Sequence, residues 1–478
     1  MSEITFSELD IRPEVQKALL DMNFKIPTEI QERAIKALSK TKRDFVGQAQ
    51  TGTGKTASFV IPLLENVTSS KKNVQALILA PTRELAAQVE QEVKKLSKYT
   101  EIRSACVYGG APIDKQIDTL RHEYPHIVVG TPGRVIDLIK RNALRIDQTN
   151  FCVLDEADEM LTMGFFEDVE LILSKIKVKK QLMMFSATMP REIEYLIRGT
   201  FNDPHIERIK RKSLSNDNIE QKYFVVRDKH LKEALSRLID DAEDVYGIIF
   251  CKTKIQTKEV ADDLKKRGHN VDVLNGDMGQ ADRDLAMERF KTKKVNLLVC
   301  TDVAARGIDV DNLTHVFNYG APRDNESYVH RIGRTGRAGM KGKAYTIIGP
   351  REKSAIQSLQ KHINKKIELS KLPTVESLKM NMVKREVENA SFIVQAIKEK
   401  GEEFHTDSSF DLVDEAFKEL NRDELMKLMF VWKFNKDMRH LNNIADIETD
   451  HSTKKSKPGK RRSKSQAFGK KRREFKRR

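Results

Sequence analysis

The residues with the most specific chemistry in this sequence form the run Ala49-Gln50-Thr51-Gly52-Thr53-Gly54-Lys55-Thr56. The run lies between a short apolar, strand-like segment and a helix-length one. Glycines let backbone N–H groups approach an anion, and the N-terminus of the following helix attracts negative charge. The lysine of such a loop reaches the β- and γ-phosphates of a nucleoside triphosphate, and the hydroxyl after it binds Mg²⁺. The loop therefore predicts a nucleotide site in which Lys55 holds phosphates and Thr56 holds the metal.

A second set of candidate residues, Asp155-Glu156-Ala157-Asp158, directly follows an apolar run at residues 151–154. Carboxylates at the C-terminal end of a parallel strand lie where ligands bind in open α/β sheets. We expect Asp155 to bind the metal ion together with Thr56, and Glu156 to orient the attacking water. The two sets together predict hydrolysis of a nucleoside triphosphate.

The elements that would position these residues alternate along most of the chain. Short apolar runs, typical of buried parallel strands, are separated by amphipathic segments of helix length. The predicted strands lie at residues 45–46, 76–79, 105–107, 127–129, 152–154 and 183–185, and then at 223–225, 248–250, 271–274, 297–299, 316–318 and 345–348. This pattern predicts two α/β domains, each a doubly wound parallel sheet with helices on both faces.

The C-terminal part of the chain has a different composition. After about residue 371 the apolar residues recur at helical spacing, which predicts a small helical module. Residues 452–478 carry fourteen Lys or Arg and one acid, a formal charge of +13 out of +16 for the whole chain. Such a segment cannot form a core and is expected to be disordered when free. We therefore divide the chain into a first domain (1–208), a linker (209–218), a second domain (219–370), a helical module (371–450) and a basic tail (451–478).

Composition also limits the cellular context. No apolar run approaches the ~18 residues that a membrane span requires. The start of the chain lacks the basic and apolar regions of a secretory signal. The four cysteines lie in strand-like runs without metal-ligand spacing, which predicts buried free thiols in a reducing compartment. These observations favour a cytoplasmic protein.

Further motifs follow one another along the chain. They are Phe24-Lys25-Ile26-Pro27-Thr28-Glu29-Ile30-Gln31, Pro81-Thr82-Arg83-Glu84-Leu85, Gly109-Gly110, Thr131-Pro132-Gly133-Arg134, Ser186-Ala187-Thr188, Ile249-Phe250-Cys251-Lys252-Thr253, Thr301-Asp302-Val303-Ala304-Ala305-Arg306-Gly307-Ile308-Asp309 and His330-Arg331-Ile332-Gly333-Arg334-Thr335-Gly336-Arg337. In this order the set resembles the DEAD-box ATP-dependent RNA helicases of superfamily two, and in particular bacterial cold-shock-type members. The resemblance covers residues 6–349 and implies two tandem RecA-like domains.

The resemblance implies how the adenine end of ATP is held. It assigns adenine recognition to Gln31, whose amide can both donate and accept a hydrogen bond. The ring of Phe24 is expected close to the base, with Phe6 supporting it. Asn23 stands where the family usually has glycine, and asparagine is the next most tolerant residue of positive φ.

The resemblance also implies a contribution from the second domain to the phosphate end. Arg334 and Arg337 are similar to the family's arginine fingers, and a planar guanidinium suits the γ-phosphate. Asp309 is expected near the ribose. Because the fingers arrive only when the domains close, hydrolysis would depend on whatever closes them.

The remaining motif residues are implied to bind RNA or to couple the two sites. Small residues and backbone N–H groups suit contacts to phosphates and sugars, which position a strand without reading its sequence. Recognition of 2′-hydroxyl groups would favour RNA over DNA. The implied RNA-binding residues are Thr82, Arg83, Gly110, Thr131, Gly133, Arg134, Thr253, Gly276, Arg283 and Thr301, and the implied coupling residues are Ser186, Thr188, Asp158, His330 and Asp302.

The function that fits best is RNA-stimulated ATP hydrolysis, with Mg²⁺, that locally unwinds or remodels RNA duplexes and RNA–protein complexes. An ATP-controlled RNA clamp or assembly scaffold is the alternative from another class, and a DNA translocase is a third. The set Lys55, Asp155, Glu156, Arg334 and Arg337 contains each group that turnover needs, which favours an enzyme over a static clamp.

Two hypotheses concern partners. The helical module lies where some cold-shock-type members carry a dimerisation region, so a homodimer is one hypothesis. The tail is expected to bind RNA backbones through counterion release, with Phe468 and Phe475 available to stack on bases. A solubilising tail, or one docked on the acidic segment 401–425, is the alternative. Ribosome assembly, RNA degradation and cold adaptation all use this helicase core, so the motifs do not name the RNA.

Overall fold

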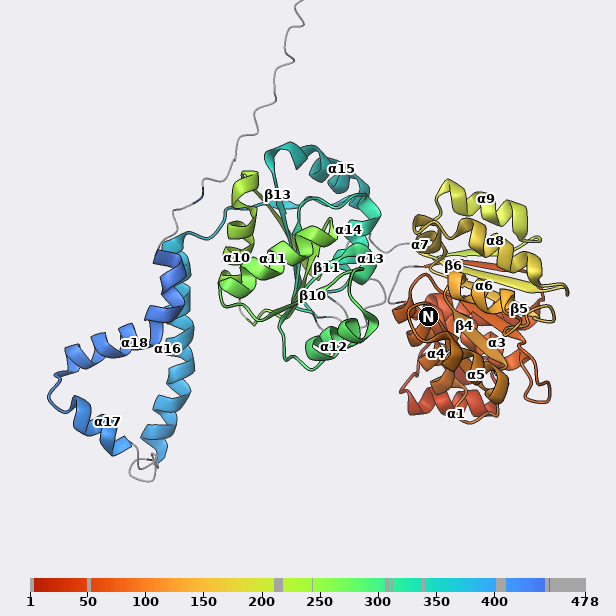
Figure 1. Cartoon of the computed structure of the whole chain (residues 1–478), viewed down its shortest axis with the longest axis horizontal. Helices are drawn as coiled ribbons and strands as arrows, with labels where there is room; N and C mark the ends of the chain where they lie inside the picture. The colour runs from red at the N-terminus through yellow and green to blue at the C-terminus, as the bar shows by residue number, and fades with distance from the viewer. Residues whose placement is uncertain are drawn as a thin grey trace, which may run out of the picture.

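The chain forms two α/β domains followed by a helical arm (Figure 1). The computed structural model describes residues 4–49, 53–209, 218–242, 244–305, 310, 313–336, 340–400, 410–442 and 447. The linker residues 210–217 and the basic tail therefore lie outside the described residues. The two parallel sheets confirm the predicted fold class.

The sheet of domain 1 brings the predicted nucleotide-binding segments to one edge. Its seven parallel strands lie in the order β3 (Ser104–Val107), β4 (Ile127–Gly130), β2 (Ala76–Leu79), β5 (Phe151–Asp155), β6 (Gln181–Ser186), β1 (Phe45–Gln48) and β7 (His205–Arg208). Asp155 pairs with Phe185, and Gln48 pairs with Ser186. The strands β5, β6 and β1 are adjacent and parallel, so their C-terminal ends lie together along one side of the sheet. The segments that follow these strands are therefore neighbours.

The helices of domain 1 cover both faces of this sheet. The helices are η1 (Phe6–Glu8), α1 (Pro13–Asp21), α2 (Glu29–Lys40), α3 (Lys55–Asn66), α4 (Arg83–Leu96), α5 (Ile113–Glu123), α6 (Pro132–Lys140), α7 (Ala157–Thr162), α8 (Phe166–Lys175) and α9 (Arg191–Thr200). Two of them, α2 and α4, begin at a threonine whose hydroxyl accepts a backbone N–H of the first turn, Thr28 from Gln31 and Thr82 from Leu85.

Domain 2 repeats the same arrangement. Its strands lie in the order β10 (Val271–Leu274), β11 (Leu297–Thr301), β9 (Gly247–Cys251), β12 (His315–Tyr319), β13 (Gly342–Ile348), β8 (Ile219–Val225) and β14 (Glu368–Leu369). Its helices are η2 (Asp228–His230), α10 (Leu231–Asp241), α11 (Lys254–Lys266), α12 (Gln280–Lys291), α13 (Asp302–Ala305), α14 (Asn325–Ile332), η3 (Pro350–Glu352) and α15 (Lys353–Ile363).

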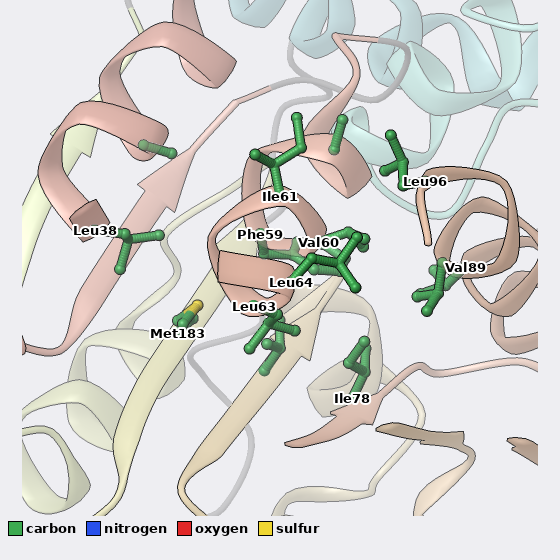
Figure 2. Close-up of a cluster of buried hydrophobic side chains, with 14 of the residues drawn as sticks. Leu38, Phe59, Val60, Ile61, Leu63, Leu64, Ile78, Val89, Leu96 and Met183 are labelled. Carbon is green, nitrogen blue, oxygen red and sulfur yellow. The ribbon is translucent and has the colours of Figure 1, made fainter. Parts of the chain in front are cut away.

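The core of domain 1 fixes the helix that follows the phosphate loop. One face of the sheet is filled by α3 and α4 side chains, including Phe59, Leu63 and Val89, against Ile78 of β2 and Met183 of β6 (Figure 2). Residues 57–64 of α3 are all buried. Burial of this kind contributes about 25 cal/mol per Å² of apolar surface. The N-terminus of α3 is therefore held rigidly at the edge of the sheet.

The helical arm consists of α16 (Val375–Lys400), α17 (Phe410–Phe417) and α18 (Arg422–Asn442). It extends away from domain 2 (Figure 1). The guanidinium of Arg385 on α16 donates to the backbone carbonyls of Asp240 (3.0 Å) and Asp241 (2.6 Å) at the end of α10. A cation at the C-terminal end of a helix satisfies its last carbonyls and complements its dipole. The start of the arm is thus anchored to domain 2.

The four cysteines are free, and the pKa of each thiol is raised because it is removed from water. Burial raises the pKa to about 12 for Cys106, Cys152 and Cys251, and well above the usual value for Cys300. Cys152, Cys251 and Cys300 are buried as predicted, whereas Cys106 is partly exposed. Within the part of the chain that the structure describes, no helix is long and apolar enough to span a bilayer.

The sequence pattern predicted six of the seven strands of each sheet, including the edge strands β3 and β10, but missed β7 and β14. In β7 (His205–Arg208) half-buried and exposed residues alternate, and among the described residues it pairs with β1 at the edge of the sheet. β14 has two residues and pairs with β8. Neither strand therefore carries the continuous apolar run that marks a buried parallel strand.

Candidate nucleotide site and interdomain cleft

A cleft at the start of α2 fits the adenine end of a nucleotide. It has a volume of about 490 Å³ and is lined by Asn23, Phe24, Lys25, Ile26, Thr28, Gln31, Thr53 and Gly54. The rings of Phe24 and Phe6 are stacked with their centroids 6.4 Å apart. Asn23 has a φ of 58°, the left-handed conformation expected at this position. Of the predicted nucleotide-binding residues, Phe24, Gln31, Thr53 and Gly54 thus line one cleft.

Gln31 joins this cleft to the phosphate loop. Its Nε2 donates to the carbonyl of Gly54 (3.1 Å), and its Oε1 accepts from the backbone N–H of Thr28 (2.8 Å). Each amide atom retains a second hydrogen-bonding position for a base. Gly54 has a φ of 74°, and a Cβ there would lie 2.4 Å from Gln31 Nε2, so only glycine fits.

The phosphate loop presents a buried cation at the N-terminus of α3. Gln50, Thr51 and Gly52 lie outside the described residues. Lys55 is 7% exposed, and its ammonium has no hydrogen-bond partner among the residues that the structure describes. A buried ammonium without an anion is costly, so the site fits a ligand that carries negative charge. Thr56 follows Lys55 in the first turn of α3.

The carboxylates after β5 lie opposite this cation. Burial raises the pKa of Asp155 to about 7, while the charge of Lys55 acts to lower it. Burial thus disfavours the charged form of this carboxyl, and a divalent cation bound beside it would favour that form, which fits a metal ligand. Glu156 has a φ of 48°, uncommon outside glycine, and its backbone N–H donates to Asp155 Oδ1 (3.0 Å). Backbone strain of this kind is often found at functional sites.

Three of the predicted coupling residues form one buried network. Asp158 Oδ2 accepts from both the backbone N–H and the hydroxyl of Thr188 (2.8 Å each). The hydroxyl of Ser186 donates to the carbonyl of Thr188 (2.7 Å) and accepts from the backbone N–H of Asp158 (3.3 Å). The end of β6 is thereby tied to the start of α7, directly beside Glu156.

A small gap separates this region from α14 of domain 2. Its volume is about 30 Å³, and its lining includes Glu156 and Glu159 from domain 1 and Ser327, His330, Arg331 and Arg334 from domain 2. Burial lowers the pKa of His330, while the carboxylates of Asp158 and Glu156 act to raise it. Arg334 and Glu156 therefore face the same space from opposite domains. Arg337 and Asp309 lie outside the described residues.

Arg331 is a buried residue of this region that sequence reasoning did not single out. Its Nε and Nη2 donate to the two carboxylate oxygens of Asp302 (2.5 and 2.7 Å), and its Nη1 donates to Asn318 Oδ1 (3.1 Å). The Asn318 amide in turn donates to Thr346 Oγ1 (3.1 Å). This pair ties α14 to the segment after β11. The sequence did not indicate this contact. The motif contains three arginines in eight residues, and their spacing does not show which of them pairs with Asp302.

A larger cleft lies between the domains on the side of the predicted RNA-binding residues. Its volume is about 810 Å³. Nine of the ten predicted residues line it, namely Thr82, Arg83, Thr131, Gly133, Arg134, Thr253, Gly276, Arg283 and Thr301. Asp302 borders both this cleft and the gap beside Glu156.

Several helices begin at this cleft. Thr82 and Thr253 cap α4 and α11 with their hydroxyls, and Thr131 is the N-cap of α6. A helix N-terminus carries partial positive charge and free N–H groups, which suit phosphates. The cleft therefore combines oriented backbone donors with arginine side chains.

Gly110, the tenth predicted residue, does not line the cleft but supports it. Its φ is 85°, and a Cβ at this position would lie 2.1 Å from Nη1 of Arg83. Only glycine leaves room for the Arg83 guanidinium at this point. Asn275 also turns away from the cleft, since it is fully buried and donates to Thr257 Oγ1 (3.1 Å).

Among the described residues, direct contacts between the domains include two beside this cleft. Arg83 Nη1 donates to Gln280 Oε1 (2.7 Å), and Arg283 Nη2 lies 2.5 Å from Glu84 Oε1. Sequence reasoning missed the roles of Glu84 and Gln280. The paired residues lie about two hundred positions apart in sequence. Only the relative position of the two domains shows that they are in contact.

Family models match both domains of the chain. A DEAD/DEAH box helicase model matches residues 28–196, and a helicase conserved C-terminal domain model matches residues 230–339. The chain is 43% identical over 430 residues to the DEAD-box ATP-dependent RNA helicase CshA of Geobacillus kaustophilus. The match covers 88% of this chain and 91% of that protein. It is also 43% identical to the Bacillus subtilis CshA over 78% of this chain and 75% of that protein.

Among solved structures, the chain is similar to S. cerevisiae Dbp5 bound to RNA and ADP BeF3. The TM-score is 0.71 with 31% identity, and the match covers 80% of this chain and 99% of Dbp5. Both domains therefore have counterparts of the same architecture in that protein.

Proposed function

Since this chain belongs to the DEAD-box ATP-dependent RNA helicases, we propose that its two domains close on ATP and a single RNA strand at once, so that RNA binding drives hydrolysis. The chain is a DEAD-box ATP-dependent RNA helicase with tandem RecA-like domains. The observation that carries the proposal is that both interdomain spaces draw their lining from both domains. The large cleft has motif residues suited to phosphate backbones, and the small gap has Glu156 opposite Arg334.

Each side chain of the nucleotide site has a distinct task in this proposal. Phe24 and Gln31 hold the base, and the loop from Gln50 to Thr56 cradles the phosphates with Lys55 as their cation. Thr56 and Asp155 would hold Mg²⁺, which neutralises charge on the β- and γ-phosphates when bound. Support comes from the unpartnered Lys55 ammonium and the raised pKa of Asp155.

The proposed chemical step needs groups from both domains. Glu156 orients water for attack on the γ-phosphate, and Arg334 with Arg337 stabilises the charge that develops there. Asp309 is proposed at the ribose. The network of Asp158, Ser186 and Thr188 fixes the backbone beside Glu156, and His330 and Asp302 carry the effect of RNA binding to it. RNA that bridges the domains thus completes the catalytic site.

Replacement of Glu156 by glutamine tests this mechanism. The amide preserves the size of the side chain but cannot hold the water as a carboxylate does, so RNA-stimulated turnover is expected to fall by about 10²-fold or more. The measurement is the steady-state ATPase rate with and without single-stranded RNA for parent and variant. The proposal is contradicted if RNA does not change the ATPase rate of the parent, or if the variant hydrolyses ATP as fast as the parent. A parent that binds RNA under ATP but never releases phosphate would instead favour the ATP-controlled clamp.

The domain divisions 1–208, 219–370 and 371–450 and the linker 209–218 are proposed on the basis of the two sheets and the helical arm. We further propose that the basic tail at 451–478 adds sequence-independent affinity for RNA, as its formal charge of +13 over residues 452–478 favours. The chain is proposed to act in the cytoplasm, within ribosome-assembly or RNA-degradation complexes.

The helical arm is proposed to pair two copies of the chain. Its exposed apolar side chains include Phe392 (77% exposed) and Trp432 (71% exposed), and an exposed apolar face of this kind marks an interaction site. Lys433 pairs with Glu386 (2.8 Å), which ties α18 to α16. Both helices can therefore present one surface to a partner.

The double substitution Phe392→Ser and Trp432→Ser is expected to convert a dimer of the full chain into a monomer at micromolar concentration, since it removes apolar surface from the interface. Sedimentation equilibrium gives the mass directly. The matched control is Leu20→Ser, because Leu20 is as exposed (72%) but lies on α1 of domain 1. A parent chain that sediments as a monomer, or a dimer that survives the double substitution, rules out pairing through the arm.

A further inference from the structure

Six basic side chains line the large interdomain cleft, and their partners divide them into two classes. In the first class a carboxylate of the protein already neutralises the charge. Lys252 pairs with Glu352, Lys254 with Asp277 (2.7 Å) and Arg283 with Glu84 (2.5 Å). A phosphate that bound to any of these would have to compete with that carboxylate.

The second class consists of Arg83, Arg134 and Arg323, which hydrogen-bond to neutral groups. Arg83 donates to Gln280, and Arg134 donates to Gln116 Oε1 (2.9 Å) and the carbonyl of Ala111 (3.1 Å). Within the described part of the chain, none of the three guanidiniums has a carboxylate within ion-pair distance. Arg83 and Arg134 belong to motifs already assigned to RNA. Arg323 belongs to no motif that the sequence singled out.

The position of Arg323 is fixed by the backbone around it. It lies between β12 and α14, and its Nη2 donates to the carbonyl of Lys252 (3.1 Å), the residue directly before Thr253. The neighbouring Asp324 is the N-cap of α14 and accepts from the backbone N–H (2.7 Å) and hydroxyl (2.8 Å) of Ser327. The one carboxylate next to Arg323 in sequence is therefore engaged by the helix.

The Lys252 side chain does not occupy the space next to its own carbonyl that the Arg323 guanidinium fills. Its ammonium pairs with Glu352, and its aliphatic chain passes over Gly320, where a Cβ would lie 3.0 Å from Lys252 Cε. Gly320 has a φ of 91°, so glycine is favoured there for two reasons. The exposed guanidinium of Arg323 thus stands beside the N-terminus of α11 with its remaining donors facing the cleft.

We propose that Arg323 is a further RNA-binding residue, which binds a phosphate of single-stranded RNA beside Thr253 on domain 2. The proposal rests on the proposed function, because it takes the large cleft as the path of the RNA. A guanidinium donates two parallel hydrogen bonds to a phosphate, and the N-terminus of α11 adds favourable charge. Arg323 extends the RNA path across domain 2 toward the start of α14.

This assignment gives α14 a ligand contact at each end. Arg323 precedes its first turn, and His330, Arg331 and Arg334 lie at or just after its last turn. A helix of eight residues is about 12 Å long and moves as one piece. RNA held at Arg323 therefore restrains the helix that carries Arg334.

The test is the affinity of the full chain for a fluorescein-labelled single-stranded oligouridine of about ten nucleotides, measured by anisotropy with Mg²⁺ and a non-hydrolysable ATP analogue. Arg323→Gln is expected to weaken binding about fivefold or more at ~0.1 M salt. It is also expected to reduce the slope of log affinity against log salt by about 0.7, the value for one phosphate contact of a single strand. A purely structural role for Arg323 would leave that slope unchanged.

Lys254→Gln is the matched control, because Lys254 lines the same cleft but pairs with Asp277. Its affinity is expected to stay within about twofold of the parent, and Arg323→Lys is expected to restore the salt slope. The proposal fails if Arg323→Gln binds RNA with the parent's affinity and salt slope. It also fails if Lys254→Gln loses as much RNA affinity as Arg323→Gln. Failure of the proposed function looks different, since the parent itself would then show no ATP-dependent RNA binding.

Discussion

RNA-stimulated ATP hydrolysis is expected to fall by about 10³-fold or more when Arg334 is replaced by alanine. Arg334 lines the gap that also contains Glu156, and it enters from the opposite domain. An arginine supplied in this way stabilises charge on the transferring phosphoryl group and is worth about 10³–10⁵ in rate. The quantity to measure is kcat at saturating RNA and ATP, because the guanidinium acts on the transition state more than on ground-state binding.

Two companion variants sharpen this experiment. Arg334→Lys keeps the charge but loses the planar fork, so it is expected to recover only part of the rate. Arg351→Ala removes an exposed arginine of domain 2 that lies outside both interdomain spaces, and it should behave like the parent. A kcat for Arg334→Ala within tenfold of the parent would mean that domain 2 does not complete the catalytic site.

The second large effect is on stability. Asp302→Ala is expected to lower the free energy of unfolding of domain 2 by about 3–5 kcal/mol, because it leaves the guanidinium of Arg331 buried without its counter-ion. The Arg331 side chain is 1% exposed, and Asp302 supplies both carboxylate oxygens to it. Hydrogen exchange measured by mass spectrometry separates domain 2 peptides from those of domain 1, which a single melting curve would not do.

The double variant Asp302→Leu with Arg331→Met distinguishes a missing counter-ion from general damage to the core. Replacing a buried ion pair by apolar residues of similar size is often close to neutral, so exchange protection is expected to return to near the parent level. If Asp302→Ala leaves protection in β11 and α14 unchanged, the pair contributes little to the fold. RNA stimulation of the double variant would then show what the pair contributes beyond stability.

Local sequence patterns were enough to predict the sheets and one end of the site. Central parallel strands are buried on both faces, so β2, and β5 up to its last residue, are apolar and easily recognised. Lys55, Asp155 and Ser186 each lie at or just after a central strand, so predicting the strands also placed these residues at one edge. The strands β7 and β14 were missed because β7 alternates half-buried and exposed residues and β14 has only two residues.

Contacts that depend on relative domain position could not be predicted in this way. The pairing of Glu84 with Arg283 requires the geometry of closure, which no spacing along the chain encodes. The bond between Arg331 and Asp302 was missed for a different reason. Its partners lie in two motifs that were each recognised, but burial decides which arginine of the motif pairs inward with Asp302.

The state of the four thiols has a practical consequence for observing closure. A thiol must lose its proton to react with maleimide or iodoacetamide reagents, and burial raises the pKa of all four thiols so far that almost none is ionised at neutral pH. One new surface cysteine on each domain could therefore carry a donor and an acceptor dye while the native residues stay in place. Energy transfer between the two dyes would then report opening and closing of single molecules during turnover.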